Sequence, residues 1–203
     1  MTRAFKVDPA GEQRKDNLFD RIFPPRRQAA GNPASLYGAI VAQAREPDLY
    51  TEIGVPDTVD GRFEMVLLHT ILVIRRLRSG DPDAVAAGQG VFDLFCTDMD
   101  RSLREMGVGD LAVPKRMRKI GESYYGRAAA YEEPLVAGDA VALAAALARN
   151  VWPEEAPQPG NAWLARYALA VAASLAESDP AVLASGSVSF PQVRRFTRTE
   201  VTG

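Results

Sequence analysis

The chain has 203 residues, of which 47% are hydrophobic and 25% charged, and its net charge is -2. This length suits one substantial domain, and this composition argues against a disordered chain, which would have far fewer core-forming side chains. It also argues against a general nucleic-acid binder, which would carry a broad basic excess. We therefore expect no DNA partner.

Single copies of two residue types limit the chemistry further. Cys96 is the only cysteine, so no intramolecular disulfide and no cysteine-based zinc site can form, and a reducing interior fits best. His69 is the only histidine, which excludes two-histidine metal sites. No apolar run of about 18 residues could span a membrane, and the start of the chain resembles neither a secretory signal nor a transit peptide. These features predict a cytoplasmic protein.

Residues 1–32 read as a polar, flexible arm ahead of the first helix. Residues 18–23 contain one short amphipathic turn, which fits either a solvated tail or a docking helix for a membrane surface or a partner. Helical spacing of apolar residues then predicts a first core helix over 35–45, and Glu46-Pro47 ends or bends it.

The next helix is the most apolar of the chain. Glycine, proline and aspartate make residues 54–61 a turn, and Asp60 is a natural N-cap for a helix over 61–79. This helix is apolar nearly all round and is therefore predicted to be the central buried helix. Gly80-Asp81-Pro82 closes it, and Asp81 or Asp83 caps a weak helical lead into the following element.

Residues 91–127 contain a helix, a glycine corner and a basic helix. The first helix has one apolar stripe, formed by Phe92, Phe95, Cys96, Met99, Leu103 and Met106. Gly107 is expected in the left-handed conformation that ends a helix, and Asp110 as the N-cap of the next helix. That helix is predicted to continue through Tyr131.

The remaining chain is also helical in character. Pro134 and Gly138 predict a turn, Asp139 caps a helix that ends near Asn150, residues 153–160 form a loop, and a last long helix covers 162–177. A short helix follows a break at Asp179-Pro180, and residues 185–203 form a polar tail. The pattern predicts an all-α, single-domain bundle of six to eight helices over 33–184.

Asp98 and Asp100 are the strongest candidates for a metal site. Carboxylates of this kind hold magnesium in helical enzymes that act on diphosphates. Residues two apart on a regular helix point about 200° apart, however, so this pair cannot share one ion. Surface ion pairs with Arg101 and Arg104 fit the spacing better. The alternative function, an isoprenoid- or lipid-binding protein or a magnesium-dependent enzyme using this pair, stays open.

No group of residues resembles a catalytic constellation. A lone histidine such as His69 on an apolar helix is more often a hydrogen-bonded core residue than a base, and Cys96 reads as a small core side chain. We expect no enzymatic activity, no cofactor, no metal and no small-molecule substrate. The basic run of Lys115, Arg116, Arg118 and Lys119 is either a solvated face or a docking surface for an acidic protein segment, RNA or lipid headgroups.

Four stretches carry a family resemblance: LYGAIVAQAREPDLY, GVPDTVDGRFEMVLLH, DMDRSLREMGVGDLAVPKRM and YYGRAAAYE. Over about residues 34–150 they resemble the ubiquinol-cytochrome c chaperone family, the bacterial relatives of the mitochondrial factor that assembles cytochrome b. The resemblance implies a non-enzymatic, all-helical chaperone that binds newly made cytochrome b. It also implies contacts with the ribosome and with the cytoplasmic face of the inner membrane.

A chaperone for an apolar client needs an accessible apolar groove with charged surroundings. We expect the partner surface to combine the GVPDT loop, the end of the central helix, and the charged faces of the two following helices. Its candidate residues are Asp57, Arg62, His69, Asp98, Arg101, Arg104, Lys115, Arg116, Arg118, Lys119 and Arg127.

Overall fold

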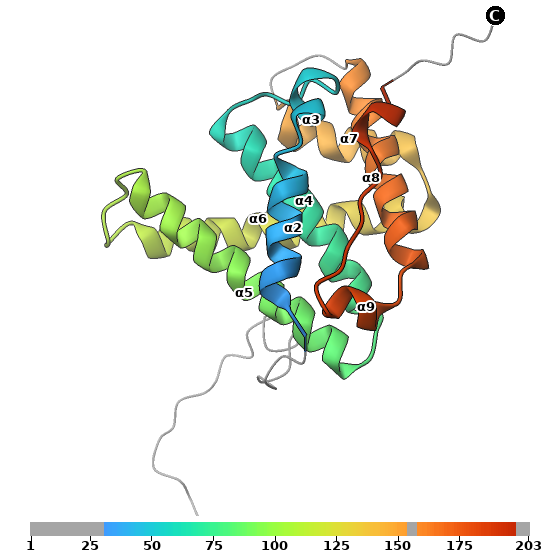
Figure 1. Cartoon of the computed structure of the whole chain (residues 1–203). Coiled ribbons are helices and arrows are strands. Elements are labelled where there is room, and N and C mark those ends of the chain that lie inside the picture. The colour runs from blue at the N-terminus through green and yellow to red at the C-terminus, as the bar shows by residue number, and fades with distance from the viewer. Residues whose placement is uncertain (1–30, 154–157, 198–203) are drawn as a thin grey trace, which may run out of the picture.

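The computed structural model describes residues 31–153 and 158–197, and these form helices and loops without a strand. The helices are α2 (Pro33–Ala44), α3 (Pro47–Thr51), α4 (Val59–Leu77), α5 (Pro82–Glu105), α6 (Val113–Ala137), α7 (Ala140–Val151), α8 (Pro159–Glu177), α9 (Pro180–Ala184) and the 3-10 helix η1 (Val193–Arg195). The predicted all-α bundle is confirmed (Figure 1). The predicted arm lies, up to residue 30, outside the described residues.

Helix α4 occupies the centre of the bundle, as predicted. It contacts α2, α5, α6, α7, α8 and α9. Every residue from Glu64 to Ile74 is buried, because the helix is apolar on nearly its whole circumference and needs neighbours on all sides. Asp60 lies in its first turn and Arg75 and Arg76 in its last, where these charges interact favourably with the helix dipole.

The start of α4 differs from the prediction. Thr58, not Asp60, is the N-cap: its hydroxyl oxygen accepts from the amide of Gly61 at 3.1 Å. The helix therefore begins at Val59, inside the predicted turn, and Asp60 lies in its first turn. Gly61 faces the carbonyl of Pro56 so closely that a Cβ there would lie 2.0 Å from that oxygen. The GVPDT loop thus folds back directly onto the helix that follows it.

We expect Gly61→Ala to destabilise the protein by about 1–3 kcal/mol, because the new methyl group can be fitted only by moving backbone. Gly126→Ala is the matched control. Gly126 lies in the interior of α6, and no atom lies within 4 Å of the place that an alanine methyl group would take there. Alanine at this position should therefore stabilise by up to about 1 kcal/mol through helix propensity. Urea unfolding of both variants checks the prediction, and equal effects of the two substitutions would contradict it.

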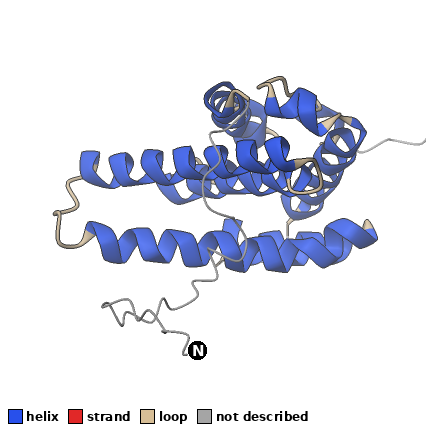
Figure 2. Ribbon diagram, turned by 90° about the horizontal axis from the view of Figure 1, so that it is seen from below, coloured by secondary structure: helices blue, strands red, loops and turns tan. Residues whose placement is uncertain are grey.

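Helices α5 and α6 form a long hairpin whose tip extends beyond the other helices (Figures 1 and 2). Asp81 caps α5 by accepting from the amide of Ala84 at 2.8 Å, which decides between the two predicted caps. The weak helical lead is continuous with the predicted helix, so α5 runs from Pro82 to Glu105. Gly107 ends this helix with φ 80°, the left-handed conformation that was expected.

Two predicted boundaries of α6 are wrong. Asp110 does not cap it; the N-cap position is Ala112, without a side-chain hydrogen bond, and Asp110 is instead paired with Arg104. Pro134 does not start a turn. It lies inside the last helical turn, and the helix continues to Gly138, whose φ of 67° ends it. Asp139 then caps α7 as predicted, accepting from the amides of Val141 and Ala142 at 2.9 Å.

The chain after α9 returns along the bundle towards α3 (Figure 1). Val193 is buried, and Phe190 and Phe196 pack on the core. The Arg194 guanidinium donates to the carboxylate of Asp48 at 2.7 Å, which links η1 to α3. Over residues 185–197, the stretch predicted as a polar tail is thus part of the packed structure.

Candidate functional site

An open groove of about 840 Å³ lies beside the outer half of the α5–α6 hairpin, next to its tip. Its walls come from the end of α2, the start of α4, the second half of α5 and the start of α6. The lining residues are Arg45, Val59, Asp60, Arg62, Phe63, Val66, Asp98, Met99, Ser102, Leu103, Glu105, Met106, Arg116, Lys119 and Ile120. This groove joins segments that are far apart in the sequence, and we call it the hairpin groove.

Apolar side chains line much of the hairpin groove. Val59 and Met106 are 65% and 54% exposed, unusual for large apolar residues. Phe63, Met99 and Ile120 are partly buried and pack against the core from the same groove. A solvent-exposed concave apolar surface of this kind is typical of an interaction site, because the release of water from it favours the binding of a partner.

Charged side chains surround this apolar surface. Arg45, Arg62, Arg116 and Lys119 are basic, and Asp60, Asp98 and Glu105 are acidic. The Arg62 guanidinium donates to Asp57 at 2.6 Å and lies 6.0 Å from the ring centroid of Tyr50. The hydrogen bond from Arg62 lowers the pKa of the Asp57 carboxyl below its ordinary value. Asp57 therefore adjoins the groove through Arg62, as the proposed use of the GVPDT loop requires.

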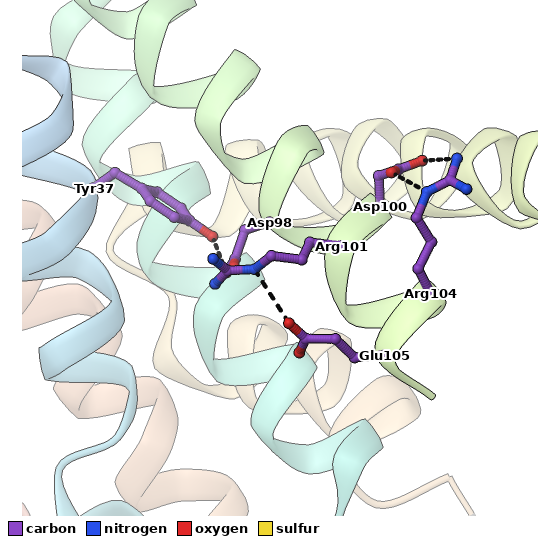
Figure 3. A network of polar contacts seen from close by, with 6 residues as sticks. All are labelled: Tyr37, Asp98, Asp100, Arg101, Arg104 and Glu105. Atoms are coloured by element: carbon purple, nitrogen blue, oxygen red, sulfur yellow. Dashed lines mark hydrogen bonds and ion pairs between the residues drawn. The ribbon is translucent and has the colours of Figure 1, made fainter. Parts of the chain in front are cut away.

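A polar network runs along the second half of α5 and reaches α2 (Figure 3). The Tyr37 hydroxyl donates to Asp98 at 2.9 Å, and Arg101 donates to the other oxygen of Asp98 at 3.2 Å. Arg101 also lies 3.6 Å from Glu105. Burial and the neighbouring Asp98 raise the pKa of the Tyr37 hydroxyl, which therefore remains a proton donor. Asp98 is thereby held between α2 and α5.

Asp100 takes part in a separate pair. The Arg104 guanidinium donates to Asp100 at 2.7 Å and is also paired with Asp110. Both predicted ion pairs, Asp98 with Arg101 and Asp100 with Arg104, are confirmed. The two carboxylates point to different partners (Figure 3), and no cluster of three potential metal ligands occurs among the residues that the structure describes.

The basic residues of α6 divide between two sides of the helix. Arg116 and Lys119 line the hairpin groove, whereas Lys115 and Arg118 do not. Arg118 forms an exposed ion pair with Glu122, four residues on, at 2.9 Å. Residues three apart share a helix face, so Arg116 and Lys119 lie on one side of α6 and Lys115 and Arg118 on another.

His69 is misplaced in the predicted partner surface, because it is completely buried. Its Nδ1 lies 2.7 Å from the carbonyl oxygen of Met65, and its Nε2 lies 2.7 Å from the hydroxyl of Tyr167 in α8. The carbonyl only accepts, so the proton is on Nδ1 and the Tyr167 hydroxyl donates to Nε2. His69 is thus the hydrogen-bonded core residue that its apolar helix face suggested.

Arg127 is also less available than predicted. Its guanidinium donates twice to Glu64 of α4, at 2.7 and 2.5 Å, and its side chain is 18% exposed. This pair joins α6 to the central helix and lies outside the hairpin groove. Of the candidate residues, the structure therefore brings four into the groove, namely Arg62, Asp98, Arg116 and Lys119.

Sequence reasoning misses the apolar half of the site. Met99 and Met106 belong to the apolar stripe of α5, which predicts a core position for both, and the turn predicted over 54–61 includes Val59. Arg45 stands out in the sequence only as the end of a helix. The one signal that could reveal this surface is the length of the stripe, which runs to the last turn before the glycine corner.

None of the helices within residues 31–153 and 158–197 is both long and apolar enough to cross a bilayer.

Comparisons with known proteins identify the family. The model of the family described as ubiquinol-cytochrome C chaperone matches residues 51–190. The chain is also similar to the Cbp3 homolog from Brucella abortus, whose crystal structure matches with a TM-score of 0.75 and 42% sequence identity, over 80% of this chain and 90% of that one. No curated protein matches. A family match over this much of the chain, together with the close structural match, shows that the chain belongs to the ubiquinol-cytochrome c chaperone family.

Proposed function

We propose that this protein is a non-enzymatic assembly chaperone of the ubiquinol-cytochrome c reductase, and that it holds a segment of newly made cytochrome b in the hairpin groove. The observation that carries the client site is the groove itself, in which Val59 and Met106 present apolar surface to solvent. The family and the similarity to the Cbp3 homolog support the assembly role.

The shape and chemistry of the groove suit a client that is made of membrane-spanning helices. A helix with its side chains is about 10–12 Å across, so an open groove of 840 Å³ takes one or two turns of one rather than enclosing it. Apolar contacts in the groove cover the segment, and the charged rim stays hydrated. Such binding needs neither catalytic residues nor a cofactor. The ribosome and the cytoplasmic face of the inner membrane remain the predicted places of the encounter.

Replacing both exposed apolar side chains of the groove tests the client site. We expect each substitution in the double variant Val59→Gln/Met106→Gln to reduce the capture of cytochrome b about tenfold. The reason is that each replaced side chain contributes roughly 1–2 kcal/mol of binding free energy when the client buries it. The measurement is photo-crosslinking of tagged protein to newly made cytochrome b in a bacterial lysate, with the adduct quantified by immunoblotting.

The matched control is Val136→Gln/Val141→Gln. These valines are 69% and 81% exposed on α6 and α7, outside the hairpin groove. The control should crosslink like the unchanged protein, and both double variants should keep its thermal unfolding midpoint. Undiminished crosslinking of the groove variant would reject this groove as the client site. A main adduct other than cytochrome b in the unchanged protein would reject the client.

A further inference from the structure

The tip of the α5–α6 hairpin is an exposed apolar corner. Its residues 106–112 are Met106, Gly107, Val108, Gly109, Asp110, Leu111 and Ala112. Leu111 is 100% exposed, more than any other large apolar residue in the described part of the chain. Asp110 is the corner's single charged residue, and its carboxylate is paired with Arg104. Arg104 also pairs with Asp100, so one cation serves both carboxylates, and apart from Asp110 the corner itself is uncharged.

Basic side chains lie directly behind this corner. Lys115 and Arg118 are exposed on the side of α6 that does not line the hairpin groove. No acidic residue occurs between Asp110 and Glu122. Arg118 pairs with Glu122 at 2.9 Å, but both side chains are exposed, and such a pair is weak enough to be exchanged for a lipid phosphate. Because the hairpin extends beyond the other helices (Figures 1 and 2), this end of the molecule can reach a flat surface without interference from the rest of the bundle.

We propose that the hairpin tip docks on an anionic lipid surface, with Leu111 inserted at the boundary of headgroups and acyl chains and with Lys115 and Arg118 on the lipid phosphates. An apolar tip with cations one to two turns behind it matches the layered chemistry of a bilayer interface. RNA would use the cations but offers no role for a fully exposed leucine. The cations fit lipid, RNA and an acidic protein segment alike, and the fully exposed Leu111 in front of them favours lipid.

This placement deepens the proposed function. Arg116 and Lys119, on the adjacent side of α6, line the hairpin groove. When the tip rests on lipid, the groove lies next to the bilayer, so an apolar segment leaving the groove has a short path into the membrane. The lipid contact itself does not depend on the identity of the client.

Vesicle flotation tests the lipid contact without any client. The full chain is mixed with vesicles of phosphatidylcholine alone or of phosphatidylcholine and phosphatidylglycerol in equal amounts. We expect flotation only with the anionic vesicles, and less of it as salt is added. Lys115→Gln/Arg118→Gln should reduce partitioning onto the vesicles about 25-fold, because each cation near such a surface increases the partition coefficient about fivefold. Leu111→Ser should reduce it about tenfold.

Matched controls use exposed residues on the far side of the bundle. Arg149→Gln/Arg166→Gln removes the same charge from α7 and α8, and Val141→Ser removes an apolar side chain from α7. Both should float like the unchanged protein. No flotation with anionic vesicles, equal flotation of tip and control variants, or binding of RNA in place of vesicles would overturn the proposal. Since no cytochrome b is present, this result is independent of the client crosslinking.

Discussion

Replacing Arg127 with leucine is expected to lower the free energy of unfolding by about 3–5 kcal/mol, the cost of leaving a buried carboxylate without its partner. Arg127 binds both carboxylate oxygens of Glu64, and the Glu64 side chain is only 7% exposed. The pair joins α6 to the central helix. Its loss therefore removes a hydrogen-bonded ion pair and also weakens the attachment of the hairpin to the bundle.

The effect should depend on pH. Burial raises the pKa of the Glu64 carboxyl above its ordinary value, although the hydrogen bond and charge of Arg127 oppose the rise. A carboxyl whose pKa is higher in the folded protein than in the unfolded chain favours folding most below the unfolded pKa, and this contribution is lost as the pH rises through the folded pKa. Without Arg127 the pKa rises further. The destabilisation of Arg127→Leu should thus be largest at neutral pH and smaller in mild acid.

Two further variants make the test decisive. Arg75→Leu removes a more exposed pair, Arg75 with Glu132, and should cost less than about 1 kcal/mol. Glu64→Leu/Arg127→Leu removes both buried charges and should recover most of the stability lost in the single variant. Urea unfolding at neutral and mildly acidic pH measures all of them. An Arg127→Leu variant no less stable than Arg75→Leu would contradict the prediction.

Protonation of His69 is expected to cost the protein about 3 kcal/mol of stability between pH 6.5 and 4. Burial lowers the pKa of His69 to about 4. The folded protein therefore binds the proton less readily than the unfolded chain, whose histidine has a pKa of about 6.5. The contribution of His69 to the free energy of unfolding is fully present above the pKa of the histidine in the unfolded chain. It falls as the pH drops towards the pKa of His69 in the folded protein.

The hydrogen-bond network explains why the neutral form is favoured. Gln43 donates to the Tyr167 hydroxyl at 2.9 Å, the hydroxyl donates to His69 Nε2, and His69 Nδ1 donates to the Met65 carbonyl. Each group has a partner while Nε2 is an acceptor. A proton on Nε2 would turn that acceptor into a donor and bring an unpaired positive charge into the core.

Comparing unfolding across pH in His69→Gln and Tyr167→Phe separates titration from packing. The stability of His69→Gln should be less sensitive to pH between 6.5 and 4, because the titrating group is gone. Tyr167→Phe keeps His69 and should keep the acid sensitivity, but it should lose about 1–3 kcal/mol at neutral pH. Parallel stability curves for the unchanged protein and His69→Gln would refute the assignment.

The spacing of apolar residues and the capping residues predicted most of the helices and the residues at which several of them begin or end. The periodicity of residues 61–79 indicated a helix that is buried on all sides, and α4 is the centre of the bundle. Gly107 and Asp139 end and begin helices as expected, because backbone conformation at a cap depends on the residue itself. The predicted cap of α4 was wrong by two residues: Thr58, not Asp60, accepts from the amide of Gly61.

The sequence by itself thus determined the helical class, the family resemblance, the central helix and the ion pairs within α5, all of which depend on residues close together in the chain. Only the tertiary structure decided what is exposed. Phe95 and Met106 lie on one apolar stripe, but Phe95 is buried against the bundle while Met106, near the hairpin tip, is 54% exposed. Periodicity shows which residues share a face; whether another helix covers that face depends on how far the hairpin extends past its neighbours.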